Sequence, residues 1–249
     1  MTADMLAFLG RRTFVGMAAG AAAVIVARPF AARAQGASAP LRIATIGAGR
    51  EGGALGTLFA KAGHPVLFSS RHPEQLKELV AGAGPNAKAG TVDEAVAFGD
   101  VVLLVVPYTA IEQIGKDHGK GLAAKQVVID VSNPIPRRDG EDFVKQVNEQ
   151  GGAGLYTQRL LPGARIVRAF NAIGSGKLAD LSQKKGGIGV PLAGDDPKAI
   201  AVASGLIKEI GFEPVLVGGL AKGKYLVPGT PLGGEHTPDE LRKIAATLT

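Results

Sequence analysis

The feature that most constrains the fold is a glycine-rich turn at residues 47–52, with the sequence Gly-Ala-Gly-Arg-Glu-Gly. An apolar segment at residues 41–46 precedes it, and residues 51–62 follow with apolar side chains at helical spacing. A second apolar segment lies at residues 65–69. In a chain with 36 glycines the GxGxxG pattern alone is weak, but its place between a strand and a helix predicts a βαβ unit that binds a dinucleotide.

Each glycine of the turn has a predicted role. Gly47 permits the tight turn, Gly49 lets the backbone approach a pyrophosphate, and Gly52 lets the helix pack closely on the sheet. The helix that follows directs its free N–H groups and its partial positive charge toward the phosphates. A purely structural glycine turn is the alternative reading, and the surrounding strand and helix signals disfavour it.

The end of the second predicted strand distinguishes between the two nicotinamide cofactors. Residues 68–73 read Phe-Ser-Ser-Arg-His-Pro and contain no carboxylate, whereas an NAD site normally has an acidic residue there for the ribose 2′-hydroxyl. Ser70 can donate to a 2′-phosphate, and Arg71 can pair with it or stack on adenine. Arg50 can add charge from the opposite side. We therefore predict a preference for NADP(H), with a solvated loop arginine as the alternative for Arg71.

The rest of the chain continues the alternation of strands and helices. Apolar runs predict strands at residues 87–89, 100–106, 127–130, 165–170, 190–193 and 214–217. Helical patterns occur at residues 73–81, 93–98, after Pro107, 197–210 and 238–248. We expect one α/β domain over residues 41–249, a Rossmann-type doubly wound parallel sheet whose ligand lies at the carboxyl ends of the strands.

The first 34 residues are typical of a twin-arginine export signal. Arg11-Arg12 precede a mild apolar run of about 15 residues, which is shorter than the roughly 20 needed to span a bilayer. Ala32-Arg33-Ala34 offers a cleavage site, so residues 35–40 form a linker and the mature protein is expected to be periplasmic or exported, without a stable membrane span. A mitochondrial-type presequence or an amphipathic helix is the alternative.

Composition excludes several function classes. The four Arg and one Asp of residues 1–34 supply +3 of the formal charge of +6, and no Lys/Arg run with interleaved aromatics indicates nucleic-acid binding. The absence of cysteine excludes disulfides, thiolate zinc sites and a cysteine nucleophile. His64, His118 and His236 lack metal-ligand spacing, so no metal is predicted. Asp196-Pro197 is expected to cap a helix.

The joined pattern of residues 46–55 and 69–74 resembles the NADPH-dependent reductases of the deazaflavin coenzyme F420. Segments at residues 130–134, 161–171, 192–197 and 211–214 follow in that family's order, so the resemblance covers essentially the whole predicted mature chain. It implies that the turn and Ser70-Arg71 hold NADP, that Val106-Pro107 lies under the adenine-ribose side, that Asn133-Pro134 lies near the nicotinamide, and that Asn171 edges the pocket. The predicted cofactor contacts are Gly47, Ala48, Gly49, Arg50, Glu51, Gly52, Ser70, Arg71, Val106, Pro107 and Asn133.

These observations predict an NADP(H)-binding oxidoreductase that transfers a hydride between NADPH and a flavin or deazaflavin acceptor. Such a transfer needs stacked orientation more than an acid or a base, so no catalytic residue is singled out. The pocket is expected between the loops at Pro107-Tyr108, Asn133 and Asn171, closed by Pro231-Leu232. The alternatives are an exported non-catalytic NADP-binding or redox-sensing module and an NADP-dependent dehydrogenase of a small substrate. A homodimer is compatible with each.

Overall fold

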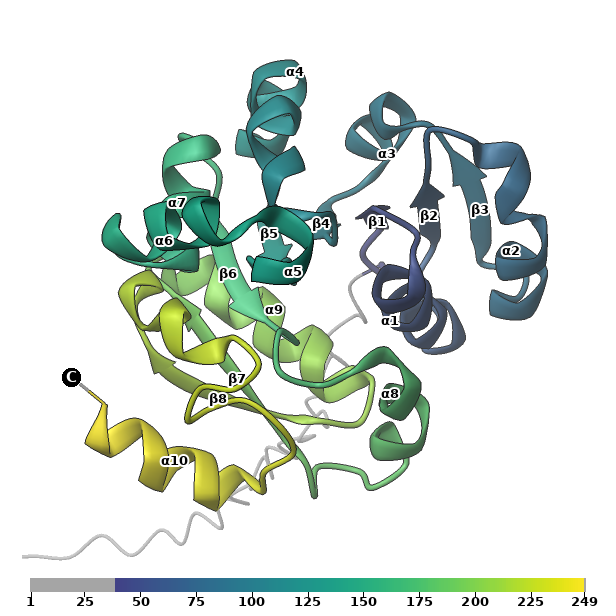
Figure 1. Cartoon of the computed structure of the whole chain (residues 1–249). Coiled ribbons are helices and arrows are strands. Elements are labelled where there is room, and N and C mark those ends of the chain that lie inside the picture. The colour runs from purple at the N-terminus through teal and green to yellow at the C-terminus, as the bar shows by residue number, and fades with distance from the viewer. Residues whose placement is uncertain (1–38, 249) are drawn as a thin grey trace, which may run out of the picture. The chain divides into compact units, whose positions relative to one another are not determined.

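The computed structural model describes residues 39–248, which form one α/β unit around a single eight-stranded sheet (Figure 1). The strand order is β3-β2-β1-β4-β5-β6-β7-β8, and the first six strands of the chain run parallel. The predicted Rossmann-type α/β domain is therefore confirmed. The predicted export signal and most of the predicted linker lie outside the described residues.

The strands are short and mostly buried on both faces. They are β1 (Ile43–Ile46), β2 (Val66–Ser69), β3 (Ala87–Gly90), β4 (Val101–Leu104), β5 (Val127–Asp130), β6 (Ile166–Ala169), β7 (Gly189–Gly194) and β8 (Glu213–Gly218). Every residue of β1, β2, β4, β5, β6 and β7 is buried, which explains why their sequences are nearly continuous apolar runs.

Helices cover both faces of the sheet. One face packs against α1 (Arg50–Lys61), α8 (Ser175–Ser182) and α9 (Pro197–Glu209). The other packs against α3 (Val92–Phe98), α4 (Ile111–Ala123), α6 (Glu141–Glu149) and α7 (Ala153–Leu160). The remaining helical segments are η1 (Pro73–Leu76), α2 (Lys77–Ala83), η2 (Tyr108–Ala110), α5 (Pro136–Asp139), η3 (Leu220–Leu226) and α10 (Pro238–Thr247).

Parallel pairing brings the functional segments to one edge of the sheet. Ile46 at the end of β1 is paired with Ser69 of β2 and with Leu104 of β4, and Leu104 is paired with Asp130 of β5. The segments after these four residues therefore leave the sheet side by side. They contain the glycine-rich turn, Ser70-Arg71, Val106-Pro107 and Asn133.

Two details of the predicted topology are wrong. The sheet is not wholly parallel, because β7 runs antiparallel to β6, while β8 runs parallel to β7. The run at residues 100–106 is longer than its strand, which ends at Leu104 so that Val105 and Val106 turn over the edge of the sheet. Within residues 39–248, no helix is long and apolar enough to cross a membrane.

Candidate functional site

The glycine-rich turn adopts a conformation that its glycines require. Gly47 has φ +100°, and a Cβ there would lie 2.1 Å from the carbonyl oxygen of Val105. A Cβ on Gly52 would lie 2.0 Å from the carbonyl oxygen of Gly47. Both positions therefore exclude any side chain, and the turn is held tightly between β1 and the loop after β4.

Gly49 differs from the other two glycines, since a Cβ there would meet no atom within 4 Å. It precedes the first residue of α1 and supplies no side-chain hydrogen bond to the helix. The first N–H groups of α1 are therefore without an intrahelical partner or a side-chain cap, in front of open space. This is the arrangement that fits a pyrophosphate.

Gly52 permits close packing where the first turn of α1 meets the ends of the strands, and a second glycine of α1 permits close packing against the sheet itself. The close contact of Gly52 is with the Gly47 carbonyl oxygen. The second glycine is Gly56, where a Cβ would lie 2.3 Å from the ring of Phe68 in β2. The two contacts differ because Gly52 is in the first turn of the helix, where the chain has just left the sheet.

Ser70 and Arg71 lie directly after β2, beside the glycine-rich turn. The Ser70 hydroxyl oxygen accepts a hydrogen bond from the backbone N–H of His72 at 3.0 Å, so its own hydrogen stays available for a ligand. Arg71 is exposed and has no hydrogen-bond or ion-pair partner within residues 39–248. Neither residue lines the cavity described next, which fits contact with the distal end of an extended dinucleotide.

A cavity of about 380 Å³ opens at the carboxyl edge of the sheet. Such a volume falls in the usual range for ligand sites. Its walls include seven of the predicted cofactor contacts, namely Gly49, Arg50, Glu51, Gly52, Val106, Pro107 and Asn133. Gly47, the first residue of the turn, does not line the cavity, and Ala48 lines a neighbouring hollow that also includes Gly49 and Arg50. The opposite wall is formed by the loop after β6, with Phe170, Asn171 and Ala172, and by Ser175 at the start of α8.

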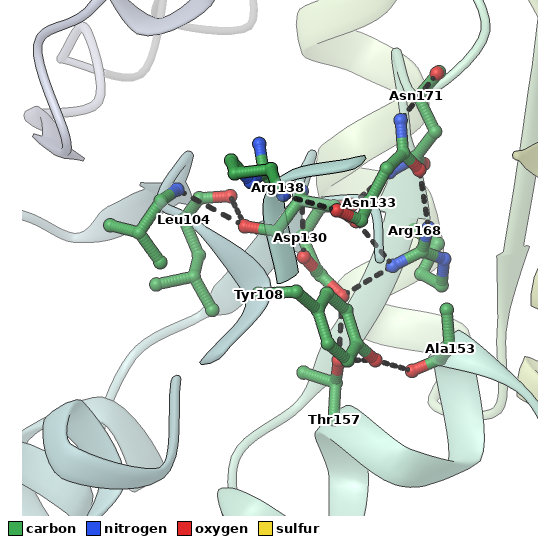
Figure 2. A network of polar contacts seen from close by, with 11 residues as sticks. Leu104, Tyr108, Asp130, Asn133, Arg138, Ala153, Thr157, Arg168 and Asn171 are labelled. Atoms are coloured by element: carbon green, nitrogen blue, oxygen red, sulfur yellow. Dashed lines mark hydrogen bonds and ion pairs between the residues drawn. The ribbon is translucent and has the colours of Figure 1, made fainter. Parts of the chain in front are cut away.

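A buried ion pair organises one side of this cavity (Figure 2). Arg168 of β6 and Asp130 of β5 are register partners, and Nη1 of Arg168 lies 2.6 Å from Oδ2 of Asp130. Both side chains are completely buried. The hydroxyl of Thr157 also donates to Oδ2 of Asp130 at 2.8 Å, and the backbone N–H of Ser132 donates to Oδ1 at 2.9 Å. These contacts offset the desolvation of both charges.

The ion pair extends into a network that orients the cavity wall (Figure 2). Nη2 of Arg168 donates to Oδ1 of Asn133 at 3.0 Å, and Nδ2 of Asn133 donates to the carbonyl oxygen of Asn171 at 2.8 Å. Nδ2 of Asn171 donates to the carbonyl oxygen of Asp130 at 3.1 Å. Because a guanidinium only donates, it fixes the Asn133 amide with its oxygen toward Arg168.

Ser132 extends the same hydrogen-bond network to the loop after β4. Its hydroxyl donates to the carbonyl oxygen of Leu104 at 3.1 Å and accepts from the backbone N–H of Val106 at 3.2 Å. Three predicted site residues, Val106, Asn133 and Asn171, are thus positioned from one buried centre. This role of Asp130 and Arg168 was not predicted from the sequence, although a charged residue in each of two adjacent apolar strands is a usable signal.

The structure contradicts three predicted pocket residues, Tyr108, Pro231 and Leu232. Tyr108 is fully buried, donates to the carbonyl oxygen of Ala153 and lies 2.8 Å from the Thr157 hydroxyl, and burial raises its pKa. It follows Pro107 but points away from the cavity, into the core beside Phe143. Leu232 is also fully buried in the core under α10, and Pro231 does not line the cavity, where Pro228 lies instead.

The cavity contains two arginines and one carboxyl group. Arg138 of α5 donates to the carbonyl oxygen of Asn133 at 2.6 Å and pairs with Asp139 at 2.8 Å. Glu51 carries the carboxyl group, and burial raises its pKa to about 7, while hydrogen bonds from Ser175 and the charge of Arg50 act in the opposite direction. Neither Arg138 nor Ser175 was predicted, because short helices after loops carry weak sequence signals. Residues 39–248 contain no group of three or more His, Cys, Asp or Glu arranged for a metal ion.

Comparison with known proteins agrees with this geometry. Residues 42–134 match the family described as NADP oxidoreductase, coenzyme F420-dependent. This segment runs from β1 through the turn and Ser70-Arg71 to Asn133, so the match covers all of the predicted cofactor contacts. The walls formed by Asn171 and Ser175 lie beyond it.

Curated relatives include two glycerol-3-phosphate dehydrogenases [NAD(P)+] of Staphylococcus epidermidis. One is 26% identical over 210 residues, which covers 69% of this chain and 62% of the relative. The other is 32% identical over 121 residues, which covers 43% of this chain and 35% of the relative. The chain thus spans less than two thirds of the length of these relatives.

Solved structures share the fold. A hypothetical protein from Sinorhizobium meliloti, SMa0349, is 29% identical with a TM-score of 0.62, over 78% of this chain and 93% of that one. A candidate F420-dependent NADP reductase from Arthrobacter sp. FB24 is 21% identical with a TM-score of 0.64, over 74% of this chain and 87% of that one.

Proposed function

We propose that this chain is an NADP(H)-dependent oxidoreductase of the coenzyme F420-dependent type, which transfers a hydride between NADPH and a flavin or deazaflavin acceptor. The observation that carries the proposal is that one cavity is lined by the open phosphate-binding turn at Gly49 and also by Asn133 and Asn171. The match of residues 42–134 to the oxidoreductase family supports the same reading.

Some residues of the site bind the phosphates of the cofactor, and others orient its nicotinamide end. The N–H groups that open α1 after Gly49 hold the pyrophosphate, and Ser70 with Arg71 holds the 2′-phosphate. The amide of Asn133, fixed by Arg168, keeps one N–H for the nicotinamide end, since its other N–H already donates to Asn171. NADPH supplies the hydride when it is bound. The protein has only to hold the two rings with the reacting carbons about 3–3.5 Å apart and to exclude water.

Stopped-flow oxidation of bound NADPH by FMN, FAD and the deazaflavin coenzyme tests the reaction. We expect at least one acceptor to oxidise bound NADPH faster than it oxidises NADPH in free solution. Asn133→Ala should slow this step, whereas Lys198→Ala, an exposed position on α9, should leave it unchanged. If NADPH binds and no acceptor reacts faster than in solution, the protein is a non-catalytic NADP-binding module. An assay with glycerol 3-phosphate and NADP tests the alternative that the protein is a dehydrogenase of a small substrate.

Export by the twin-arginine route is a separate part of the proposal, supported by Arg11-Arg12 and the Ala32-Arg33-Ala34 site. Replacement of both arginines by lysine should trap the precursor in the cytoplasm, and unchanged periplasmic yield would contradict export.

A homodimer is expected to show as twice the chain mass in light scattering, and a single chain mass would exclude it.

A further inference from the structure

A carboxyl group stands in the cavity wall at the place where phosphates are expected. Glu51 is the second residue of α1, and it lines the cavity together with its neighbours Arg50 and Gly52. Ser175, the first residue of α8, lines the same cavity and hydrogen-bonds to the Glu51 carboxyl group. Glu51 therefore lies where α1 and α8 pack together beside the phosphate-binding turn.

The carboxyl group is only partly satisfied. Its oxygen Oε1 is buried and has no hydrogen-bond partner in the described part of the chain. An ionised carboxylate needs more solvation than a neutral carboxylic acid, so this burial favours the protonated form. The resulting pKa of about 7 means that Glu51 is close to half ionised near neutral pH before any ligand binds.

The residues around Glu51 provide little positive charge to stabilise its ionised form. Arg50 is the charged neighbour that stabilises the carboxylate, and the other cation lining the cavity, Arg138, is paired with Asp139. The charged residues on α1 and on the helices packed against it are Arg50, Glu51 and Lys61 on α1, Lys77 and Glu78 on α2, and Lys177 and Asp180 on α8. Strands β1 and β2 contribute none, and Lys177 pairs with Glu235.

We propose that Glu51 takes up a proton when NADPH binds, so that the phosphates are held against a neutral carboxylic acid and not against a carboxylate. The inference rests on the proposed function, because the pyrophosphate supplies the negative charge. That charge repels an ionised Glu51, whereas the protonated group offers an O–H donor to a phosphate oxygen. The affinity for NADPH therefore falls as the pH rises above neutrality.

Titration calorimetry of the full chain with NADPH, in buffers of different ionisation enthalpy, measures the proton directly. At pH 6 the wild type should take up almost none through Glu51, and at pH 8 it should take up about 0.8 proton more than Glu51→Gln. The NADPH dissociation constant of the wild type should rise up to about tenfold per pH unit between pH 7 and 9, and that of Glu51→Gln should rise much less. The 2′-phosphate titrates near pH 6, but it contributes equally to both proteins.

Glu78→Gln, an exposed position on α2, is the matched control and should behave as the wild type. Equal proton uptake by the wild type and Glu51→Gln at pH 8 would overturn the inference. If Glu51→Gln does not fold, the wild type alone tests the inference. A wild type that takes up no proton on binding NADPH at pH 8 would contradict it. NADPH binding without proton linkage leaves the proposed function standing, whereas no NADPH binding at any pH overturns both.

Discussion

Nη1 of Arg168 lies 2.6 Å from Oδ2 of Asp130, and neither side chain reaches solvent. The pair joins β5 to β6 beside the candidate site, and it positions Asn133 through a second guanidinium hydrogen bond. Stability and site geometry are therefore coupled at this point. A change that removes one charge leaves the other buried without compensation.

Asp130→Asn should accordingly destabilise the protein by about 3–5 kcal/mol, measured as the free energy of unfolding in urea. Glu112→Gln is the control, because Glu112 pairs with Lys116 in an exposed ion pair at 2.7 Å, and such a pair contributes about 0.5 kcal/mol or less. A loss below about 1 kcal/mol for Asp130→Asn would show that the buried pair does not hold the two strands together.

Substitutions at two glycines of the turn should separate an effect on folding from an effect on NADPH binding. Gly47→Ala should cost about 3 kcal/mol or more, because φ +100° and the Val105 carbonyl oxygen at 2.1 Å both exclude a methyl group. Gly49→Ala should fold nearly as well as the wild type, since its Cβ meets no atom within 4 Å. The added methyl group occupies the approach to the pyrophosphate, so NADPH affinity should fall about tenfold or more, or ~1.4 kcal/mol. Thermal melting and NADPH titration check the two effects, and unchanged NADPH affinity would show that the phosphates do not lie at Gly49.

Much of the fold was predictable because its signals are local. The apolar runs of β1, β2, β4, β5 and β6 sit in strands that are buried on both faces, and Asp196 accepts from the backbone N–H of Ala199 as a helix cap should. The direction of β7 was not predictable. An apolar run fits either direction equally well, and the path of the chain through α8 decides it.

The site was predictable only in part, for a similar reason. The turn at Gly47–Gly52 and the loop at Asn133 follow strands directly, so parallel pairing places them together. Side-chain direction within a loop depends on tertiary packing. Pro107 and Tyr108 are adjacent in sequence, yet one lines the cavity and the other is buried in the core.

The pKa of Glu51 predicts a pH-dependent stability that needs no ligand. Because the folded pKa of about 7 lies above the reference value of 4.5, the protonated group stabilises the fold fully below pH 4.5, and this contribution is lost as the pH rises through 7. Glu51→Gln has no such loss. From pH 5 to pH 8 its free energy of unfolding should gain about 1–2 kcal/mol relative to the wild type, a range that allows for partial solvent screening. Urea unfolding at both pH values measures the gain, and parallel pH profiles would contradict it.

Arg71 determines the preference between the two nicotinamide cofactors if it pairs with the 2′-phosphate. Its side chain is exposed at the end of β2, beside Ser70, and no carboxylate lies between residues 68 and 73 to bind a 2′-hydroxyl. Arg71→Ala should weaken NADPH binding by about 1.5–3 kcal/mol, the worth of a charge-assisted hydrogen bond, and should leave NADH binding nearly unchanged. Lys198→Ala, an exposed cation on α9, controls for the general loss of positive charge. Equal weakening of NADPH and NADH would show that Arg71 contacts a part common to both nucleotides, such as adenine, and not the 2′-phosphate.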